Sequence, residues 1–196
     1  IVRMAVQRQP DLRIHCVLSN GTVRVLVRDS AEKVMAWIPI ETTGYVDDVC
    51  VLPGTSTAKE DNVYYTVRRT INAATVRYIE KWAQEDECQG TYSISPTLNK
   101  QADSFVVAAG GSATLSGLTH LIGASVIVWA NGKDLGAYTV NGAGEITVSE
   151  AVGAAGAVVG LSYEARFKST KLGQALAKFK NVDHIAPILY NTHARG

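Results

Sequence analysis

The chain has 196 residues, of which 46% are hydrophobic and 19% are charged, and its formal net charge is +1. This composition is typical of one large or two small globular domains and excludes a disordered or fibrous chain. Sequence-specific binding of duplex DNA usually comes with a clear basic excess, so the near-neutral charge argues against that function.

The first region, residues 1–83, has the pattern of successive short strands. Asn20-Gly21 separates two runs of alternating β-branched residues, and this dipeptide is a strong hairpin signal because both residues tolerate a positive φ. Short strands at regular spacing predict an all-β chain that begins with a propeller- or sandwich-like antiparallel region. The strands are expected at residues 13–18, 22–28, 34–40, 45–52, 62–70 and 75–82.

The second region is expected to be a small inserted antiparallel β domain over residues 105–167. The dipeptides Asn131-Gly132 and Asn141-Gly142 mark turns between strands of about five residues. Strands are expected at residues 112–118, 126–130, 135–140, 145–148, 157–161 and 163–167. Residues 84–104, which lack the alternation, are interpreted as the linker between the two regions.

Residues 168–196 are interpreted as a segment that returns to the first region. Its first part fits either a helix or an extended ribbon, and residues 182–190 are predicted to form a strand. Because the chain begins with Ile1 and ends with Gly196, we expect it to be a fragment of a longer polypeptide.

The sequence contains no recognisable catalytic, cofactor-binding or metal-binding motif. Its four histidines share no metal-ligand spacing. Asp47 and Asp48 are neighbours in one expected strand and point to opposite faces, so they do not converge as a catalytic pair. The three cysteines fit reduced thiols packed as small hydrophobic residues; they are Cys16, Cys50 and Cys88. We therefore expect no enzyme activity, no cofactor and no small-molecule substrate.

The hairpin expected at residues 62–82 combines aromatic and basic side chains on both faces. Such a mixture suits contact with a nucleic-acid backbone, and it equally suits a subunit interface, where Tyr, Trp and Arg are enriched. The interface is the favoured interpretation, and its candidate residues are Tyr64, Tyr65, Arg68, Arg69, Arg77 and Tyr78.

Residues 44–54, 60–72 and 76–80, in this order, resemble the tail nozzle family of short-tailed bacteriophages, also called tail tubular protein B or stabilisation protein. The second region is similar to the small inserted β domain of that family at residues 117–121, 128–132 and 160–163. The closing residues 182–185 and 191–196 are similar too. The chain departs from the family in being several times shorter and in carrying Ala73 where a hairpin glycine is usual.

The resemblance implies a structural subunit of the virion tail that is assembled in the host cytoplasm. It implies a homo-oligomer, expected to be a hexameric ring, that joins the tail adaptor ring and holds tail fibres or spikes. Such a ring conducts DNA during ejection without sequence-specific binding. A low net charge suits this role, because a strongly basic lumen would bind DNA and slow its passage.

The alternative interpretation is a β-rich adhesin or glycan-binding module of a phage or bacterial surface. Trp37, Trp82 and Trp129 would then serve as stacking platforms for sugar rings. An exposed pair of tryptophans would favour this alternative over the nozzle.

Overall fold

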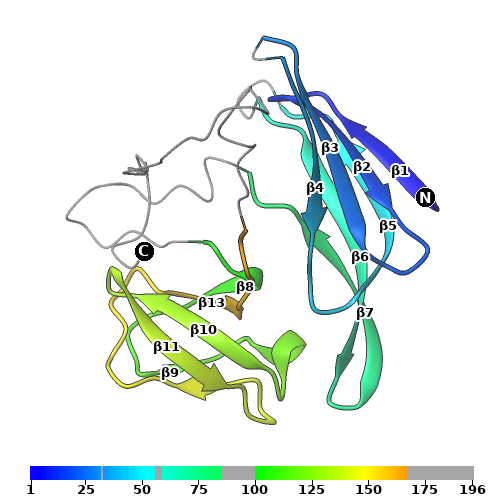
Figure 1. The fold of residues 1–196 in the computed structure, drawn as a ribbon. Coiled ribbons are helices and arrows are strands. Elements are labelled where there is room, and N and C mark those ends of the chain that lie inside the picture. The colour runs from blue at the N-terminus through cyan, green and yellow to red at the C-terminus, as the bar shows by residue number, and fades with distance from the viewer. Residues whose placement is uncertain (32, 56–58, 85–99, 167–196) are drawn as a thin grey trace, which may run out of the picture. The chain divides into compact units, whose positions relative to one another are not determined.

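The computed structural model describes residues 1–31, 33–55, 59–84 and 100–166. These residues form antiparallel β-sheets, and the only helix in the described ranges is a single 3-10 turn, Thr119–Leu121. The all-β prediction is therefore confirmed (Figure 1). The sequence predictions for residues 85–99 and 168–196 lie outside the described residues.

The first sheet contains four consecutive strands in the order β1-β2-β3-β4, joined as neighbouring hairpins (Figure 1). β1 was not anticipated, because residues 3–7 carry no complete apolar alternation. β4 lies at the edge of the sheet and contains Pro39. Proline has no N–H group, and an edge strand tolerates it because an N–H on its free side would bond to no neighbouring strand of the sheet. The strands are β1 Arg3–Gln7, β2 Leu12–Val17, β3 Val23–Asp29 and β4 Val34–Ile40.

The second sheet has the order β5-β6-β7 and packs its buried face against the first sheet. Every second residue of β6 is buried, as expected for a strand with one face in a core. The shared core consists of Val17, Val23, Val25, Val46, Val49, Val63, Tyr65 and Val67. The strands are β5 Tyr45–Leu52, β6 Asn62–Ile71 and β7 Ala74–Lys81.

β6 and β7 are joined by the two-residue turn Asn72-Ala73, between the paired residues Ile71 and Ala74. Asn72 has φ 47° and Ala73 has φ 61°, the positive values that a type I′ hairpin turn requires at both positions. Glycine adopts this conformation without strain, whereas the Cβ atom of alanine makes it unfavourable. The turn is therefore of the tight hairpin type despite its alanine.

Replacing Ala73 with glycine should raise the free energy of unfolding by about 1 kcal/mol, because it removes the left-handed strain at the turn. The matched control is Ala74→Gly at the next position, which lies in β7 and should instead lower stability by about 0.5–1 kcal/mol. Urea unfolding of the two variants measures both values. A loss of stability in both variants would contradict the turn assignment.

The second region contains a four-stranded sheet in the order β11-β10-β13-β8 and a two-stranded sheet of β9 and β12. Every residue of β13 is buried, since it lies between β10 and β8. An apolar core separate from the first one fills this region. The strands are β8 Asp103–Ala108, β9 Thr114–Leu115, β10 Ser125–Ala130, β11 Lys133–Thr139, β12 Ile146–Thr147 and β13 Ala157–Leu161.

Three local predictions for the second region differ from the structure. β8 begins at Asp103, inside the stretch interpreted as linker. The strand expected at residues 112–118 is reduced to β9, because Gly117 has φ 87° and turns the chain there. Of the strand expected at residues 163–167, the described residues 163–166 are not in a strand. Among the described residues, β13 is the last strand of this region along the chain.

Candidate functional site

The six interface candidates separate by burial, because alternate residues of a strand face opposite sides of the sheet. Tyr65 and Arg69 lie on the buried face of β6, and Arg69 is only 3% exposed. Tyr64 and Arg68 are half-buried on the other face. The candidates on β7 are half-buried Tyr78 and exposed Arg77. Four of the candidates are therefore at least partly accessible from solvent, whereas Tyr65 and Arg69 are buried.

Arg69 is the centre of a buried polar network. Its Nε and Nη2 atoms donate to the two carboxylate oxygens of Glu80 at 2.8 and 2.7 Å, a bidentate arrangement that fits the planar guanidinium. It also donates to the Thr42 hydroxyl at 2.9 Å and to the carbonyl oxygen of Thr43. The Asp103 carboxylate lies 3.7 Å from Nη2.

The pKa of Arg69 reflects this setting. Burial lowers it, whereas the hydrogen bonds and charge of Glu80 and the charge of Asp103 raise it, and the net direction is upward. Arg69 thus stays charged where it is buried, and its partners are the carboxylates that offset the cost of removing it from water.

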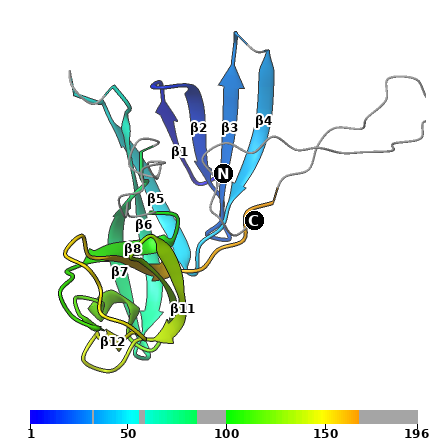
Figure 2. The ribbon, with the colours of Figure 1, turned by 90° about the vertical axis from the view of Figure 1, so that its left-hand side faces the viewer.

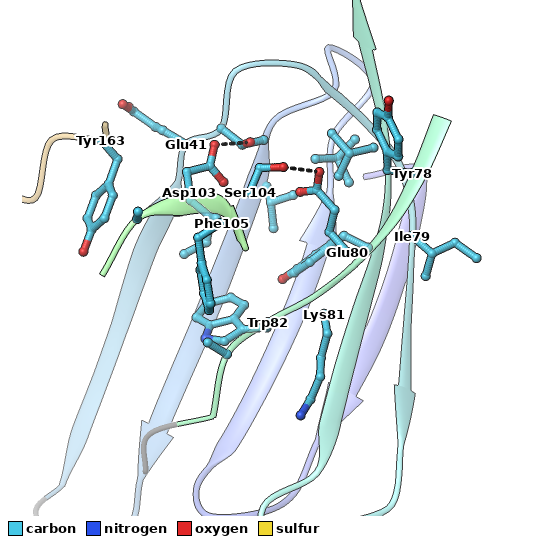
Figure 3. A pocket seen from close by; sticks show the side chains of 18 of the residues that line it. Glu41, Tyr78, Ile79, Glu80, Lys81, Trp82, Asp103, Ser104, Phe105 and Tyr163 are labelled. Atoms are coloured by element: carbon cyan, nitrogen blue, oxygen red, sulfur yellow. Dashed lines mark hydrogen bonds between the residues drawn. The ribbon is translucent and has the colours of Figure 1, made fainter. Parts of the chain in front are cut away.

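The network reaches from the hairpin to β8 (Figure 3). The Thr42 hydroxyl donates to Asp103 at 2.7 Å, and the Ser104 hydroxyl donates to Glu80 at 3.0 Å. His120, in the 3-10 turn, makes a hydrogen bond of 3.0 Å with the carbonyl oxygen of Ser104. Its ring also meets the ring of Tyr78 edge-on, with the centroids 6.3 Å apart. These contacts give Arg69 and Tyr78 a structural role within the chain.

The two arginines on the other face of the hairpin share one acidic partner. Arg68 and Arg77 lie 2.8 and 3.3 Å from the same oxygen of Asp47. The Arg68 guanidinium also stacks over the ring of Tyr45, 4.2 Å from its centroid. Because Asp47 offsets part of their charge, these arginines do not form the strongly basic groove that nucleic-acid backbones favour.

A second buried network surrounds His15 on β2. Gln7 donates its amide to the carbonyl oxygen of Gln9 at 2.8 Å, which points its own carbonyl oxygen at His15 Nε2, 3.1 Å away. His15 Nε2 is then the donor, and His15 Nδ1 accepts from the Tyr65 hydroxyl at 2.6 Å. Trp82 covers the imidazole edge-on, with the centroids 5.3 Å apart.

The His15 network holds an uncharged imidazole inside the core. Burial, assisted by the charge of Arg13, lowers the pKa of His15 to about 4. Burial also raises the pKa of Tyr65, so its hydroxyl stays a donor. His15 and Tyr65 are both buried and are not in contact with solvent. The hydrogen bond between them holds Tyr65, one of the interface candidates, in the core.

A cavity of about 830 Å³ lies beside these networks (Figure 3). Aromatic side chains from four separate segments contribute to its lining; they are Tyr65, Tyr78, Trp82, Phe105 and Tyr163. Its acidic side chains are Glu41, Glu80 and Asp103. Since Arg69 binds Glu80 and lies beside Asp103, these two carboxylates are engaged in holding the fold together.

The outer face of the first sheet, turned away from the core, carries a row of apolar side chains between Arg24 and Arg28. Val6, Ile14, Leu26 and Trp37 lie opposite one another across all four strands. Trp37 is 57% exposed and Met35, beside it on β4, is 74% exposed. The sequence could have indicated this surface through residues 34–40, which carry no polar or charged side chain on either face of the strand.

The tryptophans do not form the exposed pair that would favour a glycan-binding module. Trp37 is exposed, whereas Trp82 packs against the core beside His15 and Tyr65. Trp129 is half-buried in β10. Trp37 is thus the single exposed tryptophan; Leu26 lies directly opposite it on β3, and Arg24 and Arg28 occupy the diagonal positions.

Two of the three cysteines are described, and both are free thiols. Cys16 is buried in β2 and Cys50 is exposed in β5. Cys88 lies outside the described residues. Among the described residues, no group of three or more His, Cys, Asp or Glu side chains is placed to hold a metal ion.

Replacing all three cysteines with serine should leave assembly intact and lower the free energy of unfolding by about 1–3 kcal/mol, chiefly through the buried Cys16. The single variant Cys50→Ser is the matched control and should leave stability within about 0.5 kcal/mol of the parent. Chemical unfolding and sedimentation measure the two effects. Loss of assembly without loss of folding would reveal a bridge or a metal site.

Within the described ranges, no helix is long and apolar enough to cross a membrane. The chain matches no protein-family model and no curated protein.

Proposed function

We propose that this chain is a structural piece of the tail nozzle of a short-tailed bacteriophage, a β wall in a homo-oligomeric ring. The observation that carries the proposal is the exposed apolar outer face of β1–β4. Soluble monomers rarely leave a contiguous apolar surface of this kind in water, and such surfaces mark contacts with other proteins. The resemblance of residues 44–54, 60–72 and 76–80 to the nozzle family supplies the identity of the assembly.

The internal architecture supports a rigid wall rather than a catalyst. Within the Arg69 network, and separately within the His15 network, the buried polar groups form hydrogen bonds with one another. The arginines that remain accessible on the hairpin, Arg68 and Arg77, are paired with Asp47. A wall that conducts DNA benefits from charges that are offset in this way, because unpaired cations would retain the phosphate backbone.

The proposed nozzle subunit should assemble with copies of itself, with the tail adaptor ring and with tail fibres or spikes, and its place is the virion tail. Mass photometry and negative-stain imaging of the purified chain test the first of these contacts. We expect closed rings, hexameric by resemblance, and weak duplex DNA binding in the same buffer. Tight DNA binding with a steep salt dependence would contradict the proposal.

The second candidate, a glycan-binding module, is favoured by the aromatic lining of the cavity. Its test is a glycan array probed with the parent chain and with Phe105→Ala. Saturable binding to one glycan class that Phe105→Ala abolishes would favour this candidate over the nozzle.

A further inference from the structure

We propose that the free edge of β4 pairs with the β4 edge of a second copy of this chain, across a two-fold axis. The inference concerns a contact that the ring does not require: an isologous contact joins copies in pairs, whereas a ring is closed by heterologous contacts. The two proposals therefore succeed or fail separately.

β4 is an unprotected edge. Within the described part of the chain, no strand pairs with its far side, as Figure 2 shows at the end of the first sheet. Its first six residues, Val34 to Pro39, are exposed, and it contains no charged side chain. Natural edge strands usually carry lysine, a bulge or an inward charge that blocks pairing with another chain. β4 has none of these devices, and only Pro39 limits it.

Pro39 identifies the backbone groups that point outward. Proline has no N–H to give to β3, so its pair with Arg24 is of the non-hydrogen-bonded kind. The two kinds of pair alternate along an antiparallel ladder, so the pairs two and four residues from Pro39 are also non-hydrogen-bonded. These are the pairs of Leu26 with Trp37 and of Arg28 with Met35. The N–H and C=O groups of Met35 and Trp37 therefore point away from β3, toward the free edge.

This edge is complementary to itself. With Ala36 on the two-fold axis, Met35 of each copy lies opposite Trp37 of the other, and each such pair exchanges two N–H···O bonds. On the outer face a methionine meets a tryptophan twice, a favourable sulfur–aromatic contact. On the inner face Val34 meets Ile38.

No like charges oppose each other in this register. The charged residues that flank β4, Lys33 and Glu41, fall opposite Pro39 and Ala31 of the second copy. Packing two outer faces directly against each other is less favourable, because β3 carries Arg24 and Arg28 on that face and they would meet their own copies. Edge pairing keeps the arginines apart and extends the apolar outer face across both copies.

The test begins with Met35→Pro. This change removes an outward N–H in both copies but no bond to β3, as Pro39 already does in the parent. Sedimentation velocity over a wide concentration range should show reversible pairing of the parent, as a monomer–dimer equilibrium where no rings have closed and as paired rings where they have. The dissociation constant of the variant should be at least about tenfold higher, because two intermolecular hydrogen bonds are lost. Circular dichroism and thermal unfolding check that the variant is folded.

A charge rescue tests the register. Trp37→Glu should dissociate the dimer, and adding Met35→Lys to it should restore association, because each new ammonium then lies opposite the new carboxylate of the other copy. Met4→Lys is the matched control: Met4 is equally exposed on the outer face but lies on β1, and its substitution should leave the dimer unchanged. A parent that forms neither dimers nor paired rings at any concentration, or pairing that is unaffected by both β4 variants, would overturn the proposal. Rings that persist in these variants would leave the nozzle proposal standing without the β4 contact.

Discussion

Arg69→Ala is expected to lower the free energy of unfolding by about 3–5 kcal/mol, the usual cost of removing one partner from a buried ion pair. The substitution leaves the carboxylates of Glu80 and Asp103 without their guanidinium, and the hydroxyl of Thr42 loses one of its two partners. Urea unfolding followed by circular dichroism measures the loss. The effect should appear in the isolated chain at any concentration, because the network lies within one chain.

The matched control for Arg69 is Arg77→Ala on the adjacent strand. The Arg77 side chain is 65% exposed and its contact with Asp47 is at the surface, so its removal should change stability by no more than about 1 kcal/mol. If Arg69→Ala instead left folding intact and weakened subunit association, Arg69 would face a neighbouring subunit, as the sequence-based interpretation assumed. The same comparison applies to Tyr65→Ala, which should also act on folding.

His15 should make the protein less stable as the pH is lowered from 6.5 to about 4. The folded chain holds His15 neutral, with a pKa of about 4, whereas the unfolded chain protonates it near its ordinary pKa of 6.5. Between these two values only the unfolded state binds the proton, so stability is fully present above pH 6.5 and is lost as the pH falls. A pKa of about 4 in the folded chain against 6.5 in the unfolded chain corresponds to a loss of about 3 kcal/mol over this pH range.

The measurement for His15 is the free energy of unfolding from urea titrations at intervals across this pH range. His15→Gln is the control, since glutamine keeps a polar side chain and does not titrate. The carboxyl groups of Asp61, Glu150 and Glu164, whose pKa values are lowered, affect the parent and the variant alike. The difference between the two slopes therefore belongs to His15, and parallel slopes would show that its imidazole is accessible to protons in the folded state.

Alternation and turn chemistry in the sequence were enough to predict most strands of the first region. Residues that alternate along β6 and the Asn-Gly turn after β2 act locally, so their effect is visible without the fold. β1 was missed because its residues pair with β2 through backbone bonds, and the pattern of their side chains does not show this. Residues 163–166, the described part of the strand expected at 163–167, alternate in the same way without forming a strand, so alternation alone does not determine pairing.

Because successive side chains of a strand alternate, the sequence is enough to place Arg68 and Arg69 on opposite faces of one strand. Which of these faces is buried depends on where the first sheet and β8 pack against the hairpin, and the structure is needed to show it. Likewise, the sequence showed that residues 34–40 are apolar on both sides, and the structure placed them at a sheet edge rather than in its middle. The physical reason is the same in both cases: periodicity is a property of the local backbone, whereas burial depends on segments that are distant in the sequence.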